Sequence, residues 1–475
     1  MNRNRMNNNG VLSHIVIIGG GFSGTCLAAE LLRGGNPSIS VTLLEPAIPG
    51  RGVAYGTQCA GHLLNVPAQK MSARADDASH FLRWAQRHYD QKAQAGDFLP
   101  RRVYGRYVEF LLQEASEDPA ARFEWRRDEA TALATSEGKT EILLRSGGRI
   151  LADKVVLALG NFPPANLRIP GITGASARYV SNPWLANALG DVKHDESVML
   201  VGCGLTSVDV AISLRERGFQ GEIHMLSRHG LLPQQHKTAQ PWPTFCDGSS
   251  PRSARGLLRL IRTQVQHAEQ QNGDWRAVID SLRPVTQKIW QALPLEEQRR
   301  FLRHLRVYWD VHRHRVAPQI GAQMATEMNG GKLEVHAGRL IAYRENESSA
   351  EVTYRERGSG QARTLRVQRV INCTGPDSDL RRVNNPLLND LIRRSLVRTD
   401  PLFLGLDTTD DGALIAADGA PSECLFTIGP LRKGNLWETT AVPEIRVLAA
   451  KLALRLTRRL EPPIIEKEHT AAAIL

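Results

Sequence analysis

Short apolar runs alternate with helical patterns along most of the chain. The runs at 15–18, 41–44, 155–159, 198–201 and 223–226 contain almost no polar residues, which is typical of strands buried on both faces. In the stretches that follow several of these runs, apolar residues recur at the spacing of a helix that packs one face against a sheet. Repeated alternation of this kind predicts parallel sheets covered by helices, so we expect an α/β fold.

A glycine-rich turn follows the first predicted strand. It comprises Gly19, Gly20, Gly21, Phe22, Ser23 and Gly24. In this G-x-G-x-x-G spacing the first glycine makes the tight turn, the second lets the backbone approach a pyrophosphate, and the third lets the helix pack closely on the strand. The free N–H groups at the start of the helix attract phosphate. Glu45 ends the next strand, where a carboxylate can accept a hydrogen bond from a ribose 2′-hydroxyl, so a dinucleotide site is predicted.

A second turn repeats this arrangement after the strand at 198–201. It comprises Gly202, Cys203, Gly204, Leu205, Thr206 and Ser207. Ser227 and Arg228 follow the next strand, so that an arginine stands where the first motif has its acid. Because an arginine pairs with a 2′-phosphate that a carboxylate would repel, this site is expected to prefer NADP. The alternative is that Arg228 is only a surface charge.

Two such motifs predict two Rossmann-like dinucleotide-binding domains, one holding FAD and one exchanging NADPH. Two further apolar runs end in Gly160 and Gly375, where a loop can pass close to a cofactor. We expect the first part of the FAD-binding domain at 11–165, the NADPH-binding domain at 166–335 and the second part of the FAD-binding domain at 336–475. Residues 251–328 carry almost no strand pattern and predict a helical insertion in the second domain.

The composition of the chain excludes several classes of protein and of site. With 475 residues, 42% hydrophobic and 23% charged, the chain has globular proportions. Its six cysteines are too far apart for a C-x-x-C redox pair or a zinc knuckle, and no metal site is expected. No apolar run is long enough to cross a membrane and no signal peptide is recognised, so a cytoplasmic protein is expected.

The net charge of +11 favours anionic partners. Much of the excess lies in the predicted helical insertion, most densely at 299–315. Two interpretations stay open: a solvated helix face, or a surface that steers an anionic substrate. Nucleic acid is not expected as a partner, because no nucleic-acid-binding motif is present and basic charge alone is weak evidence.

Six stretches, at 19–24, 52–56, 62–68, 309–315, 425–430 and 437–446, resemble a bacterial family of FAD/NAD(P)-binding oxidoreductases related to the N-hydroxylating flavoprotein monooxygenases. An FAD-dependent urate hydroxylase is a possible relative. The resemblance implies that Leu64 and Asn65 run beside the flavin ring, with Asn65 contacting the flavin or the nicotinamide; a turn-capping asparagine is the alternative.

The resemblance also implies contacts at the other end of the flavin and with the substrate. Gly429, Glu438 and Thr440 would contact the flavin, although Pro430 stands where many flavoproteins have an aspartate. Arg102 would face the substrate or the nicotinamide, with the start of an ordinary amphipathic helix as the alternative. Asn65 and Arg102 are therefore the candidate catalytic residues.

The activity implied is that of an NADPH-dependent FAD monooxygenase, in which a flavin C4a-hydroperoxide hydroxylates a small polar metabolite. The substrate would be an anion or an amine, and molecular oxygen the second substrate. Three alternatives remain: a flavin-dependent NAD(P)H oxidoreductase that does not oxygenate, a urate hydroxylase, and a flavin-holding regulator that contacts nucleic acid.

Overall fold

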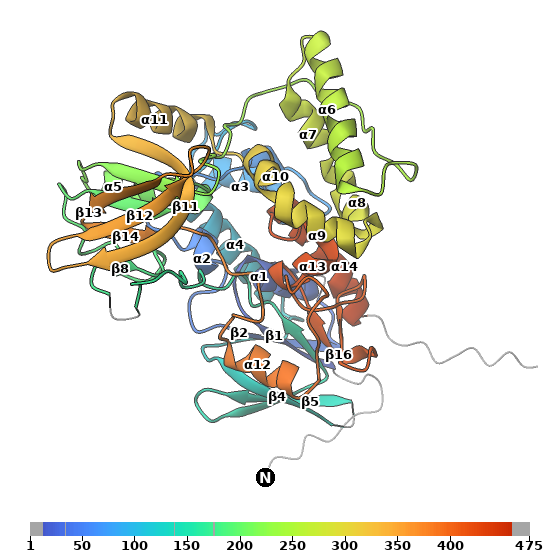
Figure 1. Ribbon diagram of the computed structural model, residues 1–475. Coiled ribbons are helices and arrows are strands. Elements are labelled where there is room, and N and C mark those ends of the chain that lie inside the picture. Colours follow the sequence, from blue (N-terminus) through green and yellow to red (C-terminus); the bar gives the residue numbers. More distant parts are fainter. Residues whose placement is uncertain (1–12, 34, 137, 174–175, 458–475) are drawn as a thin grey trace, which may run out of the picture.

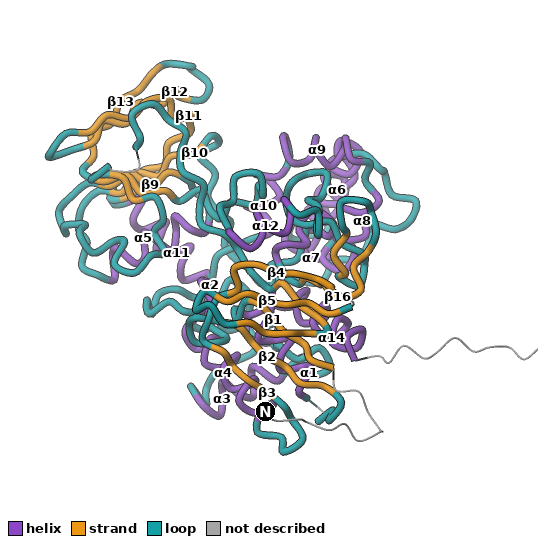
Figure 2. Tube along the Cα trace, turned by 90° about the horizontal axis from the view of Figure 1, so that it is seen from below, coloured by secondary structure: helices purple, strands orange, loops and turns teal. Residues whose placement is uncertain are grey.

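The computed structural model describes residues 13–33, 35–136, 138–173 and 176–457. Its strands form two large sheets and one small one, and the larger sheets belong to separate bodies (Figure 1). Figure 2 shows the second sheet and the helices α6, α8 and α9 on different sides of the first sheet. No helix in the described part of the chain is both long and apolar enough to cross a membrane.

The first sheet has the strand order β15-β16-β7-β1-β2-β3. Its strands are β1 (Ser13–Ile18), β2 (Ile39–Leu44), β3 (Phe123–Arg126), β7 (Lys154–Leu157), β15 (Ala413–Ile415) and β16 (Pro421–Thr427). β1 pairs in parallel with both β2 and β7. Strands from both ends of the chain therefore build one domain.

Both faces of this sheet are covered, as the continuous apolar runs predict. Ile15 and Ile17 of β1 face the helices α1 (Phe22–Leu32), α4 (Arg101–Ser116) and α14 (Val442–Thr457). Val16 and Ile18 face the small antiparallel sheet β4-β5-β6 and helix α12. The bounds of these elements are β4 (Ala130–Ser136), β5 (Lys139–Leu144), β6 (Arg149–Ala152) and α12 (Pro386–Arg393).

Shorter elements complete the first domain. They are α2 (Gly52–Tyr55), η1 (Ala68–Lys70), α3 (His80–His88), η3 (Pro430–Arg432) and α13 (Lys433–Leu436).

The second sheet has the order β13-β12-β11-β10-β9-β14-β8. Its strands are β8 (Tyr179–Val180), β9 (Val198–Val201), β10 (Ile223–Ser227), β11 (Leu333–Glu345), β12 (Ala350–Glu356), β13 (Ala362–Val367) and β14 (Arg369–Asn372). Helices α5 (Leu205–Glu216) and α11 (Pro318–Asn329) cover one of its faces. The expected boundary at 335/336 is therefore too early, because β11 runs through it and β12 to β14 also belong to this sheet.

Helices fill the connection between β10 and β11, in agreement with the predicted insertion. They are α6 (Ala254–Gln270), α7 (Trp275–Ser281), η2 (Arg283–Val285), α8 (Thr286–Ala292), α9 (Leu295–His304) and α10 (Arg306–Arg313). α11, which the prediction included, packs on the second sheet instead. Trp290 of α8 stacks on Trp437 of the first domain, so the insertion rests on that domain.

One ion pair links the two nucleotide domains directly. Arg101, at the start of α4, donates two hydrogen bonds to Asp209 of α5, at 2.6 and 3.0 Å. Beside it, the backbone N–H groups of Ala60 and Gly61 donate to the carboxylate of Glu216 on the same helix. These contacts hold the loop before Leu64 against the second domain.

Candidate functional site

The first glycine turn is shaped by backbone contacts. Gly19 has a φ of +105°, and a Cβ there would lie 2.4 Å from the carbonyl oxygen of Ala158 on the neighbouring segment. A Cβ at Gly24 would lie 1.9 Å from the carbonyl oxygen of Gly19. Helix α1 begins after Gly21 with no side-chain cap, which leaves its first N–H groups for a ligand. Phe22 and Ser23, in the first turn of α1, are buried. The turn thus fits a bound pyrophosphate.

The half-buried carboxylate of Glu45 supports this turn. It accepts hydrogen bonds from the backbone N–H groups of Gly20, at 2.7 Å, and Ala47, at 3.0 Å. A Cβ at Gly20 would lie 2.6 Å from the Cβ of Glu45, so glycine is needed for this approach. Because each carboxylate oxygen can accept a second hydrogen bond, Glu45 keeps acceptor capacity for a ribose hydroxyl.

The second turn has the same plan with more open space. Gly202 has a φ of +129°, and a Cβ there would lie 2.2 Å from the carbonyl oxygen of Cys373. A Cβ at Gly204 would meet no atom within 4 Å, and α5 begins after it with no side-chain cap. Ser207 is buried and donates its hydroxyl to the carbonyl of Gly202 at 2.7 Å. This turn therefore also fits a pyrophosphate.

The residues predicted to read the second ribose lie at the end of β10. The Ser227 hydroxyl accepts a hydrogen bond from the N–H of Gly230 at 3.0 Å, which holds the loop that follows. Arg228 is exposed, so its guanidinium can reach a ligand in solvent. The geometry is compatible with a contact to a 2′-phosphate.

A cavity of about 490 Å³ lies where the two domains and the insertion meet. The predicted residues that line it are Asn65, Gly160, Gly202, Gly204, Thr206, Gly375 and Thr440. Those outside its lining are Gly19, Gly20, Gly21, Phe22, Ser23, Gly24, Glu45, Leu64, Ser207, Ser227, Arg228, Gly429 and Glu438, besides Arg102. The structure thus brings the second glycine turn, Gly160 and Gly375 to one cavity with Asn65 and Thr440, whereas the first glycine turn and Glu45 lie outside its lining.

The loop that carries Asn65 is fixed from both domains. The backbone N–H of Leu64, which is buried, donates to the carbonyl of Leu99 at 2.8 Å. The carbonyl of Asn65 accepts a hydrogen bond from Nε2 of His236, at 2.9 Å, in the loop after β10. Burial, and then the positive Arg315, lower the pKa of His236 to about 4, so this imidazole is neutral and can donate through Nε2. No motif in the sequence pointed to His236.

The candidate Arg102 does not reach the cavity. It is exposed, whereas the preceding Arg101 turns toward the second domain and also donates its Nε–H to the carbonyl of Leu63 at 3.0 Å. Adjacent residues of a helix point about 100° apart, so only one of the two can face the neighbouring domain. Arg101, and not Arg102, therefore contributes here, and its role is to link the two domains.

Glu438 is buried behind the cavity wall. Its carboxylate accepts a hydrogen bond from Nε1 of Trp309 at 3.0 Å and lies 3.8 Å from the guanidinium of Arg313. Its backbone carbonyl accepts from Gln287 at 2.7 Å. The structure therefore places Glu438 in contact with the insertion and not at the surface of the cavity. Gly429, with a φ of +85°, is buried against Ser23, and its neighbour Pro430 lines the cavity.

Four titratable residues that the sequence did not single out for this site line one wall of the cavity. They are Arg306, Asp310, His314 and Lys433. Burial, and then the positive Arg306, lower the pKa of Lys433 to about 8, which brings this amine close to neutral pH. Burial also lowers the pKa of His314. For Arg306, Asp310 and His314 the signals in the sequence were the dense charge at 299–315 and the resemblance at 309–315, neither of which shows what faces inward, and no signal marked Lys433.

The helices of the insertion enclose a second, apolar cavity of about 560 Å³. Leu305, Tyr308, Trp309 and His312 of the α10 region line it, while Arg306, Asp310 and His314 line the first cavity. The helix α10 thus lies between an apolar cavity and one lined by both polar and apolar residues.

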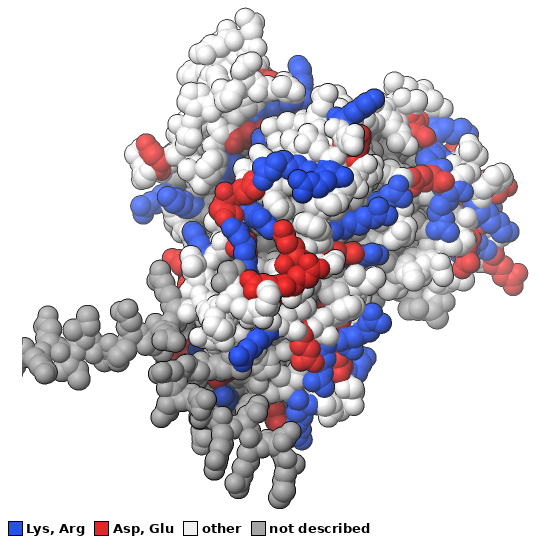
Figure 3. Space-filling model, turned by 180° about the vertical axis from the view of Figure 1, so that it is seen from behind, with Lys and Arg blue, Asp and Glu red and all other residues white. Residues whose placement is uncertain are grey.

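Most arginines of the charged stretch are paired. Arg299 and Arg300 bond with Glu296 and Glu297, and the buried Arg315 pairs with Asp280. Figure 3 shows basic and acidic side chains interspersed on the face opposite to that of Figure 1. This distribution supports neither a continuous nucleic-acid surface nor a single anion-steering patch on that face.

Comparison with known proteins agrees with this architecture. Residues 16–162 match the FAD-NAD(P)-binding family model. No curated protein matches the sequence.

Several solved structures share the fold over nearly their whole length. The L-lysine 6-monooxygenase from Pseudomonas syringae has a TM-score of 0.64 and 17% identity, covering 94% of this chain and 100% of that one. The ornithine N-hydroxylase KtzI from Kutzneria sp. 744, solved with reduced FAD, NADP⁺ and L-ornithine, has a TM-score of 0.60 and 13% identity, covering 93% and 98%.

A third similar structure is the FAD-bound cadaverine monooxygenase DfoA from Erwinia amylovora. It has a TM-score of 0.61 and 12% identity, covering 98% of this chain and 100% of that one. At these identities the similarity establishes the fold. The chain therefore has the fold of these monooxygenase structures, and its residues 16–162 match a family model described as FAD-NAD(P)-binding.

Proposed function

We propose that the protein is an NADPH-dependent FAD monooxygenase that hydroxylates a small organic molecule. The observation that carries this proposal is the cavity of about 490 Å³ into which Asn65, the turn at Gly202–Thr206, Gly375 and Thr440 all open. A flavin held by the first domain and a nicotinamide held by the second would meet there. The similar structures named for ornithine, lysine and cadaverine hydroxylation are consistent with this activity.

The residues present fit both cofactors. The uncapped start of α1, with Gly19, Gly24 and Glu45, would hold the ADP half of FAD, and the uncapped start of α5, with Gly204 and Arg228, would hold NADPH. When bound, FAD would accept a hydride from NADPH and activate dioxygen. The protein's own contribution is to orient the two rings and to limit the access of water.

The charged residues on the wall of the cavity would accept protons from the substrate and donate them. Hydroxylation of an amine requires a substrate nitrogen with a free lone pair, so a nearby group must accept or share its proton. Lys433, with a pKa of about 8, changes its charge near the pH at which an enzyme works. Asp310 and His314 lie on the same wall and can pass protons between the substrate and solvent.

The rival function is an NAD(P)H oxidoreductase that uses the same cofactors without oxygenating a substrate. Both rivals consume NADPH, so the fate of oxygen separates them. The FAD-loaded protein should be incubated with NADPH, isotopically labelled dioxygen and a panel of amines and organic anions, urate included.

A monooxygenase incorporates one labelled oxygen atom into the product and forms little hydrogen peroxide with the right substrate. Lys433→Met should lower hydroxylation more than NADPH oxidation, whereas Lys451→Met, at an exposed position of α14, should change neither. NADPH oxidation that yields only peroxide with every member of the panel would favour the oxidoreductase without oxygenation.

A further inference from the structure

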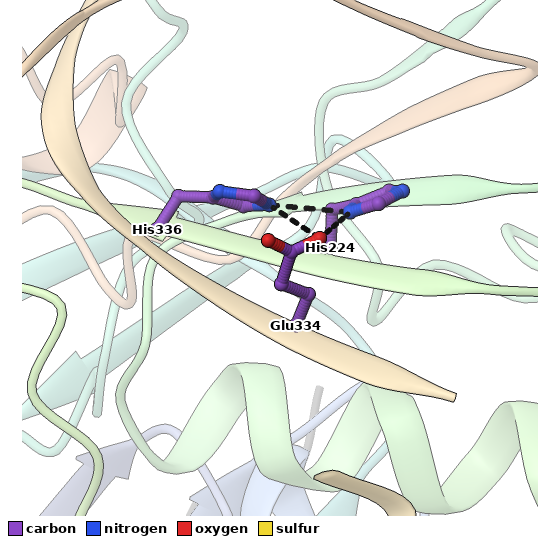
Figure 4. Close-up of side chains that lie close together, drawn as sticks. All are labelled: His224, Glu334 and His336. Carbon is purple, nitrogen blue, oxygen red and sulfur yellow. Dashed lines mark hydrogen bonds and ion pairs between the residues drawn. The ribbon is translucent and has the colours of Figure 1, made fainter. Parts of the chain in front are cut away.

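Two histidines and one glutamate meet on the second sheet, away from the cofactor cavity. His224 lies on β10, and Glu334 and His336 lie on β11 (Figure 4). Their ligand atoms, one from each side chain, all lie within 4.8 Å of one another. None of the three residues lines either of the cavities described above.

The register of the parallel strands produces this cluster. His224 pairs with Glu334, and Leu226 pairs with His336. Glu334 and His336 are two residues apart on one strand, so their side chains project from the same face of the sheet. His224 is more than a hundred residues from the other two in sequence, and the pairing of β10 with β11 brings it to them. Figure 4 shows both imidazoles and the carboxylate converging on one point.

The distances suit one small cation. Nδ1 of His224 lies 3.2 Å from Nε2 of His336, and these nitrogens lie 3.6 and 3.7 Å from a carboxylate oxygen of Glu334. Two nitrogens bound at about 2.0–2.1 Å to a tetrahedral zinc ion lie about 3.3–3.4 Å apart. Small side-chain rotations would therefore bring all three groups to coordination distance.

The outer nitrogens of both rings have partners that favour the metal-binding tautomer. Nδ1 of His336 lies 3.2 Å from the hydroxyl oxygen of Tyr354, which can accept a hydrogen bond from an Nδ1–H group. Nε2 of His224 lies 3.8 Å from the carboxylate of Glu222. With those protons on the outer nitrogens, the two inner nitrogens both present lone pairs to the same point. Outer acceptors of this kind orient histidine ligands in known metal sites.

We infer that His224, Glu334 and His336 form a binding site for a divalent transition-metal ion of the zinc type. Two imidazoles and one carboxylate are a suitable ligand set for zinc and leave a fourth position for water. The His224 and His336 side chains are 12% and 9% exposed, whereas Glu334 is 65% exposed, so the ion would enter from the carboxylate side. A bound ion would fasten β10 to β11, the strand from which the antiparallel extension begins.

The test is a Zn²⁺ titration of the FAD-loaded full chain, without a histidine tag and after removal of metal by chelation. Calorimetry and elemental analysis should show about one equivalent of Zn²⁺ bound. Glu334→Gln and His336→Ala should each weaken binding by more than about 100-fold, because they remove a direct ligand. Tyr354→Phe should weaken it by roughly 10- to 100-fold, the range for loss of an outer partner.

Matched controls separate this site from adventitious binding. His304→Ala removes an exposed histidine at the end of α9 and should leave Zn²⁺ affinity unchanged. Glu334→Gln is the decisive variant, since an exposed side chain can be changed without disturbing the sheet. The inference is overturned if the wild type binds no Zn²⁺, or if Glu334→Gln and His336→Ala bind it as tightly as the wild type. In either case the two histidines only share a hydrogen bond.

Discussion

The two glycine turns have the same plan but differ in how tightly they are closed. In both, a glycine with positive φ lies against a carbonyl of the neighbouring segment, Ala158 in the first and Cys373 in the second. In both, a hydroxyl donates to a turn carbonyl five residues before it: Thr25 to Gly20 at 2.8 Å, and Ser207 to Gly202 at 2.7 Å.

The differences follow from what each turn has to hold. In the first, Gly24 has no room for a Cβ, and the carboxylate of Glu45 is already bonded to the turn. In the second, the equivalent of Gly24 is Ser207, which has a side chain, and Arg228 is exposed, whereas Gly21 and Gly204, which are equivalent, both have room for a Cβ. A closed turn suits a nucleotide that stays bound, and an open one suits a nucleotide that exchanges. The comparison thus supports FAD in the first domain and NADPH in the second.

The largest effect is expected from adding one methyl group to each turn. Gly24→Ala forces a Cβ against the Gly19 carbonyl, which cannot move without opening the turn, so we expect a loss of about 3 kcal/mol of unfolding free energy and of bound FAD. Gly204→Ala should change unfolding free energy by less than about 1 kcal/mol, because its Cβ meets no protein atom. It should instead raise the KM for NADPH about tenfold or more.

Flavin absorbance per protein, urea unfolding and NADPH kinetics of both variants check this pair. The contrast fails if Gly204→Ala leaves the KM for NADPH unchanged, or if Gly24→Ala keeps its FAD.

The next effect concerns the ion pair between Arg101 and Asp209, which links the two nucleotide domains. Arg101→Ala leaves the Asp209 carboxylate, 9% exposed, without its cation, which costs about 3 kcal/mol for a buried pair. The first domain should retain FAD, while hydride transfer from NADPH slows because the two rings lose their alignment. Stopped-flow reduction of the flavin measures this.

Arg106→Ala, at an exposed position of the same helix, is the matched control and should reduce the flavin at the wild-type rate. Equal rates for the two variants would show that Arg101 does not align the domains.

A smaller effect is expected at the residue that distinguishes the coenzymes. A charge-assisted hydrogen bond contributes about 1.5–3 kcal/mol, so Arg228→Ala should raise the KM for NADPH about tenfold or more and leave that for NADH almost unchanged. Steady-state kinetics with both coenzymes give the answer. If both respond equally, Arg228 does not contact the 2′-phosphate.

Local patterns in the sequence predicted the parts of the fold that local physics decides. The strand, glycine turn and helix at 15–32 and 198–214 depend on residues a few positions apart, and the structure has them there. The domain boundary was wrong because β11 first pairs in parallel with β10 and then antiparallel with β12. Alternating apolar residues indicate a strand but do not say which sheet it joins.

The site was harder to predict because its chemistry depends on how each helix is rotated about its axis and on which side chains are buried. The choice between Arg101 and Arg102 turns on the rotation of α4, which depends on the packing of the whole helix. The lowered pKa of Lys433 arises from burial against the insertion, and no local pattern marks it. The cluster of His224, Glu334 and His336 requires the register of β10 and β11.

The smallest effect concerns the contact between the second domain and the Asn65 loop. The pKa of His236 is lowered to about 4 in the folded protein, from an ordinary value of about 6.5, mainly by burial. Above the ordinary value the imidazole is neutral in both states, and the stability due to this group is fully present. Between the two values the unfolded chain binds the proton and the folded protein does not, so stability falls as the pH falls.

From about pH 7 to about pH 5 this loss amounts to about 2 kcal/mol. His236→Gln keeps a donor for the Asn65 carbonyl but does not titrate, so it should lose about 2 kcal/mol less than the wild type over that range. Urea unfolding at both pH values gives the difference, in which the other titrating groups cancel. His304→Gln, at an exposed site, should behave as the wild type. An equal loss in wild type and His236→Gln would mean that His236 is not held neutral, and that the Asn65 loop is fixed from the first domain alone.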